Sequence, residues 1–345
     1  MTPKERVYAR LAGLPVDKIP NMNIAMGLVA KLAGVSYSRY AQDYRKLAEG
    51  NLLCAERFGF DTVSAISDPM REAAAFGATV EFPENGVPFS RIPLLRDPVD
   101  LSALQKVDPL DHPRTLDRIR GVELLHEKAG QDYPVIGWVE GVLAELADLR
   151  GVNELMMDLA DEEEYLAEAM EIIFVQQCRF AKAQIDAGAD FIGVGNAVAS
   201  LVGPALYAAY ALDYDRRLTE YIHGCGAKVK LHICGNTGPL LELIKEVSPD
   251  IFDIDWMVDF QGAVSRYAGC ATAVNGNMDP VSVMLQGDAE AIEQAVRHCI
   301  AAAGNTTMIA AGCEIPAETP EANLLLMDKL LYRTKCEEWK GGAGR

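Results

Sequence analysis

Short apolar or β-branched runs, each bounded by turn residues, alternate along the chain with longer segments whose apolar positions have helical spacing. The helical segments include 153–187, 240–247 and 289–303. The strand-like runs lie at 20–25, 61–66, 134–138, 191–195, 228–234, 251–255, 273–277 and 307–311. Strands that alternate with helices pair in parallel through right-handed crossovers, and eight such units close into a barrel. The pattern therefore predicts an α/β fold, a single (β/α)8 (TIM) barrel.

Two segments stand outside this alternation. Residues 1–19 precede the first run, and we expect them to form an N-terminal helical lead-in. Residues 78–111 are rich in Pro and Gly, which predicts an irregular insertion that forms a lid or rim. No linker divides the remainder, so we expect the whole chain, 1–345, to be one domain. An open doubly wound sheet is the alternative, and the absence of Gly-x-Gly-x-x-Gly after the first run is only weak evidence against it.

Composition and charge narrow the class of protein. Of 345 residues, 50% are hydrophobic and 24% are charged, which is enough to bury a large core. The formal charge of -18 opposes phosphate binding, so we expect no nucleic-acid partner. No stretch approaches about 18 uncharged apolar residues, and the N-terminus lacks the apolar core of a signal peptide. We therefore expect a cytoplasmic protein with no membrane segment.

The cysteines are spread too thinly for a disulfide framework, so most are expected to be reduced thiols. They lie at positions 54, 178, 225, 234, 270, 299, 313 and 336. For any one of them, the simplest interpretation is a small buried apolar group.

The run at 228–234 carries the most informative pattern. Side chains alternate along a strand, so an apolar row (229, 231, 233) should face the helices, and Lys230, His232 and Cys234 should face inward. His232 and Cys234 then lie at the carboxyl end of the strand, where barrel active sites occur. Cys313 follows the last run and reaches the same rim. Two thiolates and one imidazole suit Zn²⁺ and leave a fourth position open, as catalytic zinc requires. The alternative is a core histidine and two packing cysteines.

Other side chains at the predicted strand ends are candidates for catalysis or binding. We expect Glu140 and Asp68 to take part in catalysis, although Glu140 could only form a rim salt bridge and Asp68 could only cap the helix after an Asp-Pro turn. Met22 and Trp138 would suit an apolar or aromatic substrate, although Trp138 could equally be a core residue. The remaining strand-end candidates are Asn196 and Asn277 for the substrate and Asp255 beside the metal.

Several motifs resemble the uroporphyrinogen decarboxylase superfamily along nearly the whole chain. Asp253-Ile254-Asp255-Trp256 and Val274-Asn275-Gly276-Asn277-Met278-Asp279-Pro280 are similar to its late barrel strands, and Ser67-Asp68 resembles its early strand-end aspartate. Two features depart from the decarboxylase itself. Uroporphyrinogen decarboxylase grips its acidic substrate with a pair of arginines near its first strand, but this chain has no arginine between Arg10 and Arg39. Cys313 also stands where the decarboxylase has a late histidine. Porphyrinogen decarboxylation is therefore not expected.

The segments 231–237 (Leu-His-Ile-Cys-Gly-Asn-Thr), 311–316 (Ala-Gly-Cys-Glu-Ile-Pro) and 319–324 (Thr-Pro-Glu-Ala-Asn-Leu) look instead like the cobamide-dependent methyltransferase branch. That resemblance implies that His232, Cys234 and Cys313 bind zinc and that Asp255 could occupy the fourth position without substrate. It also implies a corrinoid cofactor (methylcobamide) carried by a partner protein, since the chain has no Asp-x-His-x-x-Gly cobamide motif.

The expected function is zinc-dependent methyl transfer between a small methylated substrate and the cobalt of a corrinoid protein, within one-carbon metabolism. A methoxylated aromatic compound or other methyl ether is favoured, as in O-demethylation, and a coenzyme M-like thiol is the alternative. A zinc-free decarboxylase and a non-catalytic protein that binds zinc or a corrinoid protein remain open as other classes. The expected partners are the corrinoid protein and, in a homodimer, a second copy of the chain.

Overall fold

The computed structural model describes residues 1–332, and residues 333–345 lie outside the described part. Within residues 1–332, seven parallel strands form one curled sheet in the order β1-β2-β3-β4-β5-β6-β7. The strands are β1 (Val63–Ser64), β2 (Val135–Glu140), β3 (Phe191–Gly195), β4 (Lys228–Ile233), β5 (Ile251–Ile254), β6 (Ala273–Met278) and β7 (Met308–Ala311). Each overlaps a predicted run, although β2 and β6 extend one or two residues beyond theirs, so the sequence pattern located all of these strands and their parallel pairing.

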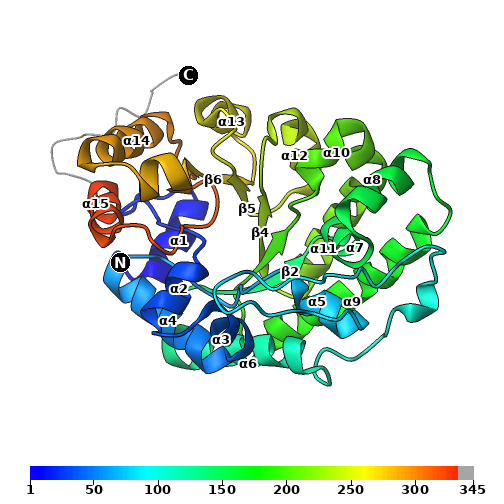
Figure 1. The fold of residues 1–345 in the computed structure, drawn as a ribbon. Coiled ribbons are helices and arrows are strands. Elements are labelled where there is room, and N and C mark those ends of the chain that lie inside the picture. The colour runs from blue at the N-terminus through cyan, green and yellow to red at the C-terminus, as the bar shows by residue number, and fades with distance from the viewer. Residues whose placement is uncertain (333–345) are drawn as a thin grey trace.

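Helices follow the strands and surround the curled sheet (Figure 1). The early helices are α1 (Pro3–Leu11), α2 (Gly27–Leu32), α3 (Tyr37–Gln42), α4 (Tyr44–Phe58), α5 (Met70–Phe76), α6 (Pro113–Ala129), α7 (Val142–Arg150), α8 (Val152–Ala160) and α9 (Leu166–Asp186). The later ones are α10 (Ala199–Leu206), α11 (Leu212–Gly224), α12 (Leu241–Val247), α13 (Phe260–Arg266), α14 (Ala289–Ala302) and α15 (Glu321–Leu331). Short 3-10 turns, η1 (Leu101–Ala103) and η3 (Gly238–Leu240), and π-helical turns, η2 (Tyr207–Ala211) and η4 (Pro280–Leu285), complete the connections.

The first predicted run, 20–25, is not a regular strand, and here the prediction of a regular eight-stranded barrel is wrong. Its one bridge is the parallel pair Asn21 and Ile309, and the Asn21 carbonyl accepts a hydrogen bond from Asp61 N at 2.8 Å, so the run lies between the two edges of the sheet. Side chains take the place of ladder bonds: Asn21 N donates to Asp61 Oδ2 at 2.7 Å, and Ala311 N donates to Asn23 Oδ1 at 2.7 Å. Pro20 has no N–H to donate and contributes only its carbonyl, which accepts from Ile309 N at 3.3 Å.

Strand β4 has the predicted sidedness. Val229, Leu231 and Ile233 are buried in the main core against the helices. Lys230 and His232 point the other way, into the curl of the sheet, as expected from strand alternation. A second, smaller apolar cluster fills that curl, and it consists of Val7, Met22, Ile66, Ile136, Trp138, Phe191, Ile251 and Met308.

The two segments outside the alternation contain one helix and one mostly irregular stretch. Helix α1 lies within the predicted lead-in, and its Val7 joins the inner apolar cluster. In the segment 78–111, the structure contains the short turn η1 and one antiparallel bridge between Glu81 and Phe89. This segment lies between α5 and α6, within the connection from β1 to β2.

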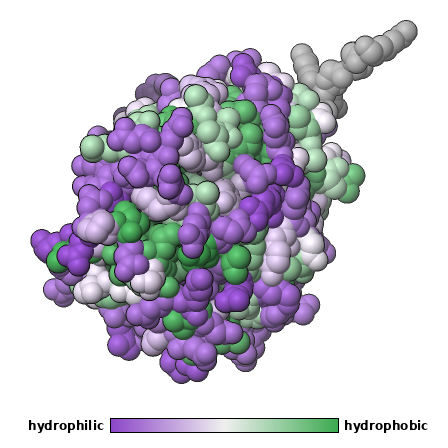
Figure 2. Space-filling view, turned by 90° about the vertical axis from the view of Figure 1, so that its right-hand side faces the viewer, coloured by the Kyte–Doolittle hydropathy of each residue, from purple (hydrophilic) through white to green (hydrophobic). Residues whose placement is uncertain are grey.

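The surface seen from the right-hand side of Figure 1 is mostly hydrophilic, with hydrophobic residues gathered among the hydrophilic ones (Figure 2). Helices α8 and α10 border this side in Figure 1, and their exposed apolar side chains include Met157 and Leu201. Among residues 1–332, no helix combines the length and apolar character needed to cross a bilayer.

Asp61 attaches the run 20–25 to the rest of the fold. Asp61 is buried, pairs with Arg6 and with Lys18 Nζ at 3.0 Å, and accepts the Asn21 N–H. Asp61→Ala leaves buried cations and a buried N–H without this partner, so we expect a loss of about 3–5 kcal/mol in the free energy of unfolding. Denaturant titration measures it. The control Asp186→Ala, in an exposed pair with Lys182, should cost less than about 1 kcal/mol; equal losses would contradict the role assigned to Asp61.

Candidate metal centre

His232, Cys234 and Cys313 come together at the carboxyl edge of the sheet. His232 lies in β4, Cys234 directly follows that strand, and Cys313 follows β7. His232 Nε2 lies 3.1 Å from Cys234 Sγ and 3.7 Å from Cys313 Sγ, and the two sulfurs are 3.6 Å apart. Among the described residues, these three form a group whose ligand atoms all lie within 4.8 Å of one another. The structure therefore assembles the three residues that the sequence predicted as ligands.

Two of the three spacings in the triad are close to those of a zinc site, and the third, His232 Nε2 to Cys234 Sγ, is shorter. Tetrahedral zinc with Zn–S near 2.3 Å and Zn–N near 2.0–2.1 Å separates two sulfurs by about 3.8 Å and a sulfur from a nitrogen by about 3.6 Å. The Cys313 pKa is lowered to about 4, chiefly by the hydrogen bond from Cys234 and by His232, against the opposing effect of burial. The same contact with Cys313, together with burial, raises the pKa of Cys234. One thiolate is thus stable in this arrangement, and a divalent cation is the group that would hold both.

The far side of the His232 ring faces a fixed carboxylate. Nδ1 is buried without a hydrogen bond, and Asp253 Oδ2 lies 3.8 Å away, too far for a hydrogen bond. Asp253 is held by an ion pair with Lys230 and by a 2.7 Å hydrogen bond from Asn275 Nδ2. Such a carboxylate behind a ligating histidine favours the tautomer that presents Nε2 to the metal. Burial lowers the His232 pKa, but Cys313 and Asp253 outweigh that effect and raise it.

The predicted fourth ligand, Asp255, is occupied by the backbone. Its Oδ2 accepts from Gly235 N at 2.9 Å and its Oδ1 accepts from Met257 N at 3.1 Å. Its oxygens are not part of the three-residue group. Asp255 therefore fixes the loop that carries Cys234, and its ligation of zinc stays a prediction.

Two buried ion pairs contain the predicted catalytic carboxylates. Asp68 accepts from Arg114 Nη2 at 2.7 and 2.6 Å and from Met70 N at 3.1 Å. Burial raises the Asp68 pKa, but Arg114 and Arg71 outweigh it, and the pKa is lowered. Asp68 thus accepts the first amide of α5 and has a structural partner in Arg114, whereas the N-cap residue of α5 is Pro69. Glu140 accepts from Arg71 Nη2 at 2.8 Å, and burial raises its pKa to about 7 even though Arg71 opposes the shift.

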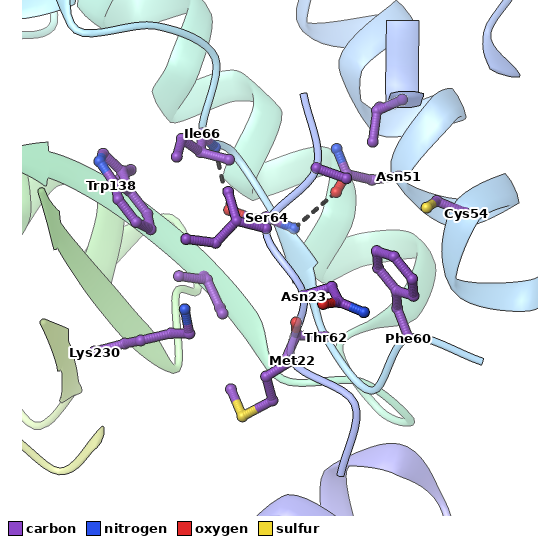
Figure 3. A pocket seen from close by; sticks show the side chains of 14 residues that line it. Met22, Asn23, Asn51, Cys54, Phe60, Thr62, Ser64, Ile66, Trp138 and Lys230 are labelled. Atoms are coloured by element: carbon purple, nitrogen blue, oxygen red, sulfur yellow. Dashed lines mark hydrogen bonds between the residues drawn. The ribbon is translucent and has the colours of Figure 1, made fainter. Parts of the chain in front are cut away.

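The predicted substrate-binding residues fall into separate places. Met22 and Trp138 line a cavity of about 20 Å³ beside Lys230, inside the curl of the sheet (Figure 3). That volume holds about one water molecule. Asn196 lies elsewhere and donates to Asp215 Oδ2 at 2.9 Å, while Asn277 donates to the carbonyls of two residues of the β5–α13 loop. The two asparagines therefore brace loops around the metal centre.

Sequence reasoning missed Glu72, Arg114 and Glu314. Glu314 Oε1 accepts from Met26 N at 3.1 Å and from Gly27 N at 2.8 Å, which ties the Cys313 loop to the start of α2. Its position directly after Cys313 was the only available signal. Glu72 lies on α5 and Arg114 on α6, and the sequence argument considered only residues at the ends of predicted strands.

Comparisons with known proteins agree with the motifs. The model of the uroporphyrinogen decarboxylase (URO-D) family matches residues 2–332. The methylcobamide:CoM methyltransferase MtbA of Methanosarcina mazei is 28% identical over 332 residues, 94% of this chain and 96% of the relative. A uroporphyrinogen decarboxylase of Gloeobacter violaceus is 30% identical over 253 residues, 69% of this chain and 72% of the relative. A solved methyltransferase from Methanosarcina mazei shares the fold with a TM-score of 0.86 at 22% identity, covering 96% of this chain and 98% of that one.

The geometry of the triad predicts its metal content. Protein loaded with zinc and dialysed against a weak chelator should retain about one zinc per chain, because three soft ligands bind one tetrahedral ion. Cys234→Ser and Cys313→Ser should each lose most of that zinc, as measured by atomic emission. Cys270→Ser, which changes a half-buried thiol outside the triad, is the matched control and should keep it. Full zinc in both triad variants would refute the assignment.

Proposed function

The chain belongs to the uroporphyrinogen decarboxylase family, and we propose that within it this protein is a zinc-dependent methyltransferase, which moves a methyl group between a small substrate and the cobalt of a corrinoid protein. The observation that carries the proposal is the His232, Cys234 and Cys313 triad, whose spacing fits zinc and leaves one tetrahedral position for a substrate atom. The extent of the match supports this branch, since similarity to a methylcobamide:CoM methyltransferase covers 94% of the chain.

At this centre, some residues would bind the metal and others position those ligands. His232, Cys234 and Cys313 would hold the ion, and zinc, when bound, supplies Lewis acidity to the substrate atom that gains or loses the methyl group. Asp253 lies behind the imidazole, 3.8 Å from Nδ1, where its charge favours a proton on that nitrogen. The Gly312 N–H donates to the Met278 carbonyl at 2.8 Å, so backbone bonding helps to keep Cys313 beside β4.

We propose a thiol as the acceptor and give a methyl ether second place. The case for a methoxylated aromatic compound depended on Met22 and Trp138, and both line a cavity of about 20 Å³ that cannot admit an aromatic ring. A small thiol needs little room, because its sulfur would bind at the open position as a third sulfur ligand. The methylcobamide:CoM methyltransferases match 94% of the chain, whereas the uroporphyrinogen decarboxylase of Gloeobacter violaceus matches 69%.

The corrinoid partner would approach the same edge of the sheet. Apolar side chains are exposed on the connections after β3, β5 and β6: Leu201 (65%), Trp256 (44%), Met257 (53%) and Val281 (47%). These connections leave the strand ends next to β4 and β7, which carry the triad. Exposed aromatic residues and methionine are enriched at protein interfaces, which supports docking of a protein-carried corrinoid at this rim.

The test uses zinc-loaded protein with cobalamin or a corrinoid protein and follows the cobamide absorbance in both directions. Methyl-Co(III) should change to Co(I) when coenzyme M or 2-mercaptoethanol is the acceptor, and Co(I) would change to methyl-Co(III) if a methoxyphenol were the donor. Cys313→Ser should reduce the transfer rate at least about 100-fold, which is about 2.7 kcal/mol of barrier, whereas Cys270→Ser should not. Turnover that needs no cobamide would contradict the proposal.

The same assay separates the two other classes of function. Decarboxylation by protein that holds no zinc would favour the zinc-free enzyme. Zinc binding or docking of a corrinoid protein, with no change in the cobamide spectrum for any substrate, would favour the non-catalytic protein.

A further inference from the structure

Two glycines on β3 leave room for side chains of β2 to lie across that strand. Gly193 and Gly195 occupy positions that face into the curl of the sheet. A Cβ atom on Gly193 would overlap the Trp138 ring, and one on Gly195 would lie 2.7 Å from Glu140 Oε2 and 3.1 Å from Trp138 Nε1. Any larger residue would push both side chains away, so the glycines are required by the close approach.

The register places Glu140 in line with the metal ligand on β4. Glu140 pairs with Gly195, and Gly195 pairs with His232. Neighbouring strands are about 4.8 Å apart, so Glu140 and His232 are separated at the backbone by about twice that distance. Because the intervening residue has no side chain, the Glu140 carboxyl group lies over β3, on the way toward the triad.

One oxygen of Glu140 is fixed and the other is open. Arg71 Nη2 donates to Oε1 at 2.8 Å, and Glu72 holds the backbone of the same residue by accepting from Glu140 N at 2.8 Å. Arg71 itself is fully buried, and its Nε lies 3.4 Å from Glu72 Oε2. Within residues 1–332 no hydrogen bond reaches Glu140 Oε2, and the Glu140 side chain keeps 9% of its surface exposed. The rim salt bridge and a site-facing carboxylate are thus both present in one residue.

The surroundings make this carboxyl group able to exchange a proton near neutral pH. Burial raises the Glu140 pKa to about 7, Arg71 lowers it, and the neighbouring carboxylates Glu72 and Asp68 raise it. Two further acids, the buried Glu145 and the half-buried Asp148, interact with the same group. A general base with a pKa near the working pH combines a useful ionised fraction with sufficient driving force.

We propose that Glu140 Oε2 accepts the proton that the substrate thiol loses on binding, with Arg71 and Glu72 as positioning residues; this rests on the proposed function. The S–H bond breaks and its proton passes to the carboxylate, directly or through one water. The sulfur keeps the electron pair and forms the S–CH3 bond, while the Co–CH3 bond breaks and its pair stays on cobalt as Co(I). In the opposite direction, the protonated Glu140 returns the proton to the departing sulfur or oxygen.

Proton release on thiol binding tests this step independently of turnover. Binding of 2-mercaptoethanol or coenzyme M is followed on cobalt(II)-substituted protein by the visible absorption of the metal, and released protons are counted in weakly buffered solution at pH 7.5–8. The wild-type protein should release clearly less than one proton per bound thiol, because the negative charge of the bound thiolate raises the Glu140 pKa above its value of about 7 in the free protein, and the carboxyl group then retains part of the proton. Glu140→Gln, which preserves the acceptor for Arg71, should release about one.

Kinetics give the second measurement. In zinc-loaded protein, Glu140→Gln should lower kcat by about 100-fold, within the usual range for a lost general base, with little change in KM and with loss of the rise in rate around pH 7. Zinc content and thermal unfolding should match the wild type. The control Glu242→Gln, whose side chain is 63% exposed, should change none of these.

The outcomes distinguish this inference from the proposed function. Equal proton release by wild type and Glu140→Gln, or an unchanged rate rise near pH 7, would overturn the role of Glu140 while thiol binding and methyl transfer persist. Failure of every thiol to perturb the cobalt(II) spectrum would instead remove the thiol proposal and the proton step that depends on it.

Discussion

The ladder through Gly195, His232 and Asp253 is the constraint on which the rest of the candidate site depends. Parallel pairing sets these three residues side by side on β3, β4 and β5. One neighbour of His232 is therefore a carboxylate that faces Nδ1, and the other is a glycine that admits Glu140 from the next strand. A shift of register by one residue would turn His232 outward into the apolar core, so the metal centre depends on the pairing.

The second half of the centre depends on the irregular run 20–25. The loop after β7, which carries Cys313 toward β4, is held by hydrogen bonds to residues 24–27. Ile315 N donates to the Ile24 carbonyl at 2.8 Å, and Glu314 accepts from the first amides of α2. If the run 20–25 were a regular strand, the Ala311 N–H would donate to a backbone carbonyl of that strand. Here it donates to the side-chain oxygen Asn23 Oδ1 instead. The departure from a regular barrel and the placement of the third ligand therefore have a common origin in this run.

The sequence predicted those features that depend on local periodicity. Alternation in the run 228–234 identified the inward row with His232 and Cys234, and strand-end logic brought Cys313 to them. The arrangement around Glu140 could not be predicted in the same way, because Arg71 and Glu72 lie on a helix whose position is set by tertiary packing. Met22 and Trp138 were assigned to the substrate from their chemistry alone. Only the curl of the sheet determines that they pack against each other inside it.

The zinc X-ray absorption spectrum tests the central claim most directly, because it reports the atoms around the metal without reference to turnover. The account predicts two sulfurs at about 2.3 Å and one nitrogen at about 2.0–2.1 Å in the zinc-loaded protein, with a third sulfur when a substrate thiol is added. Cys313→Ser should lose one of the sulfurs. A first shell of oxygen and nitrogen alone, or a sulfur count that the substitution does not change, would contradict it.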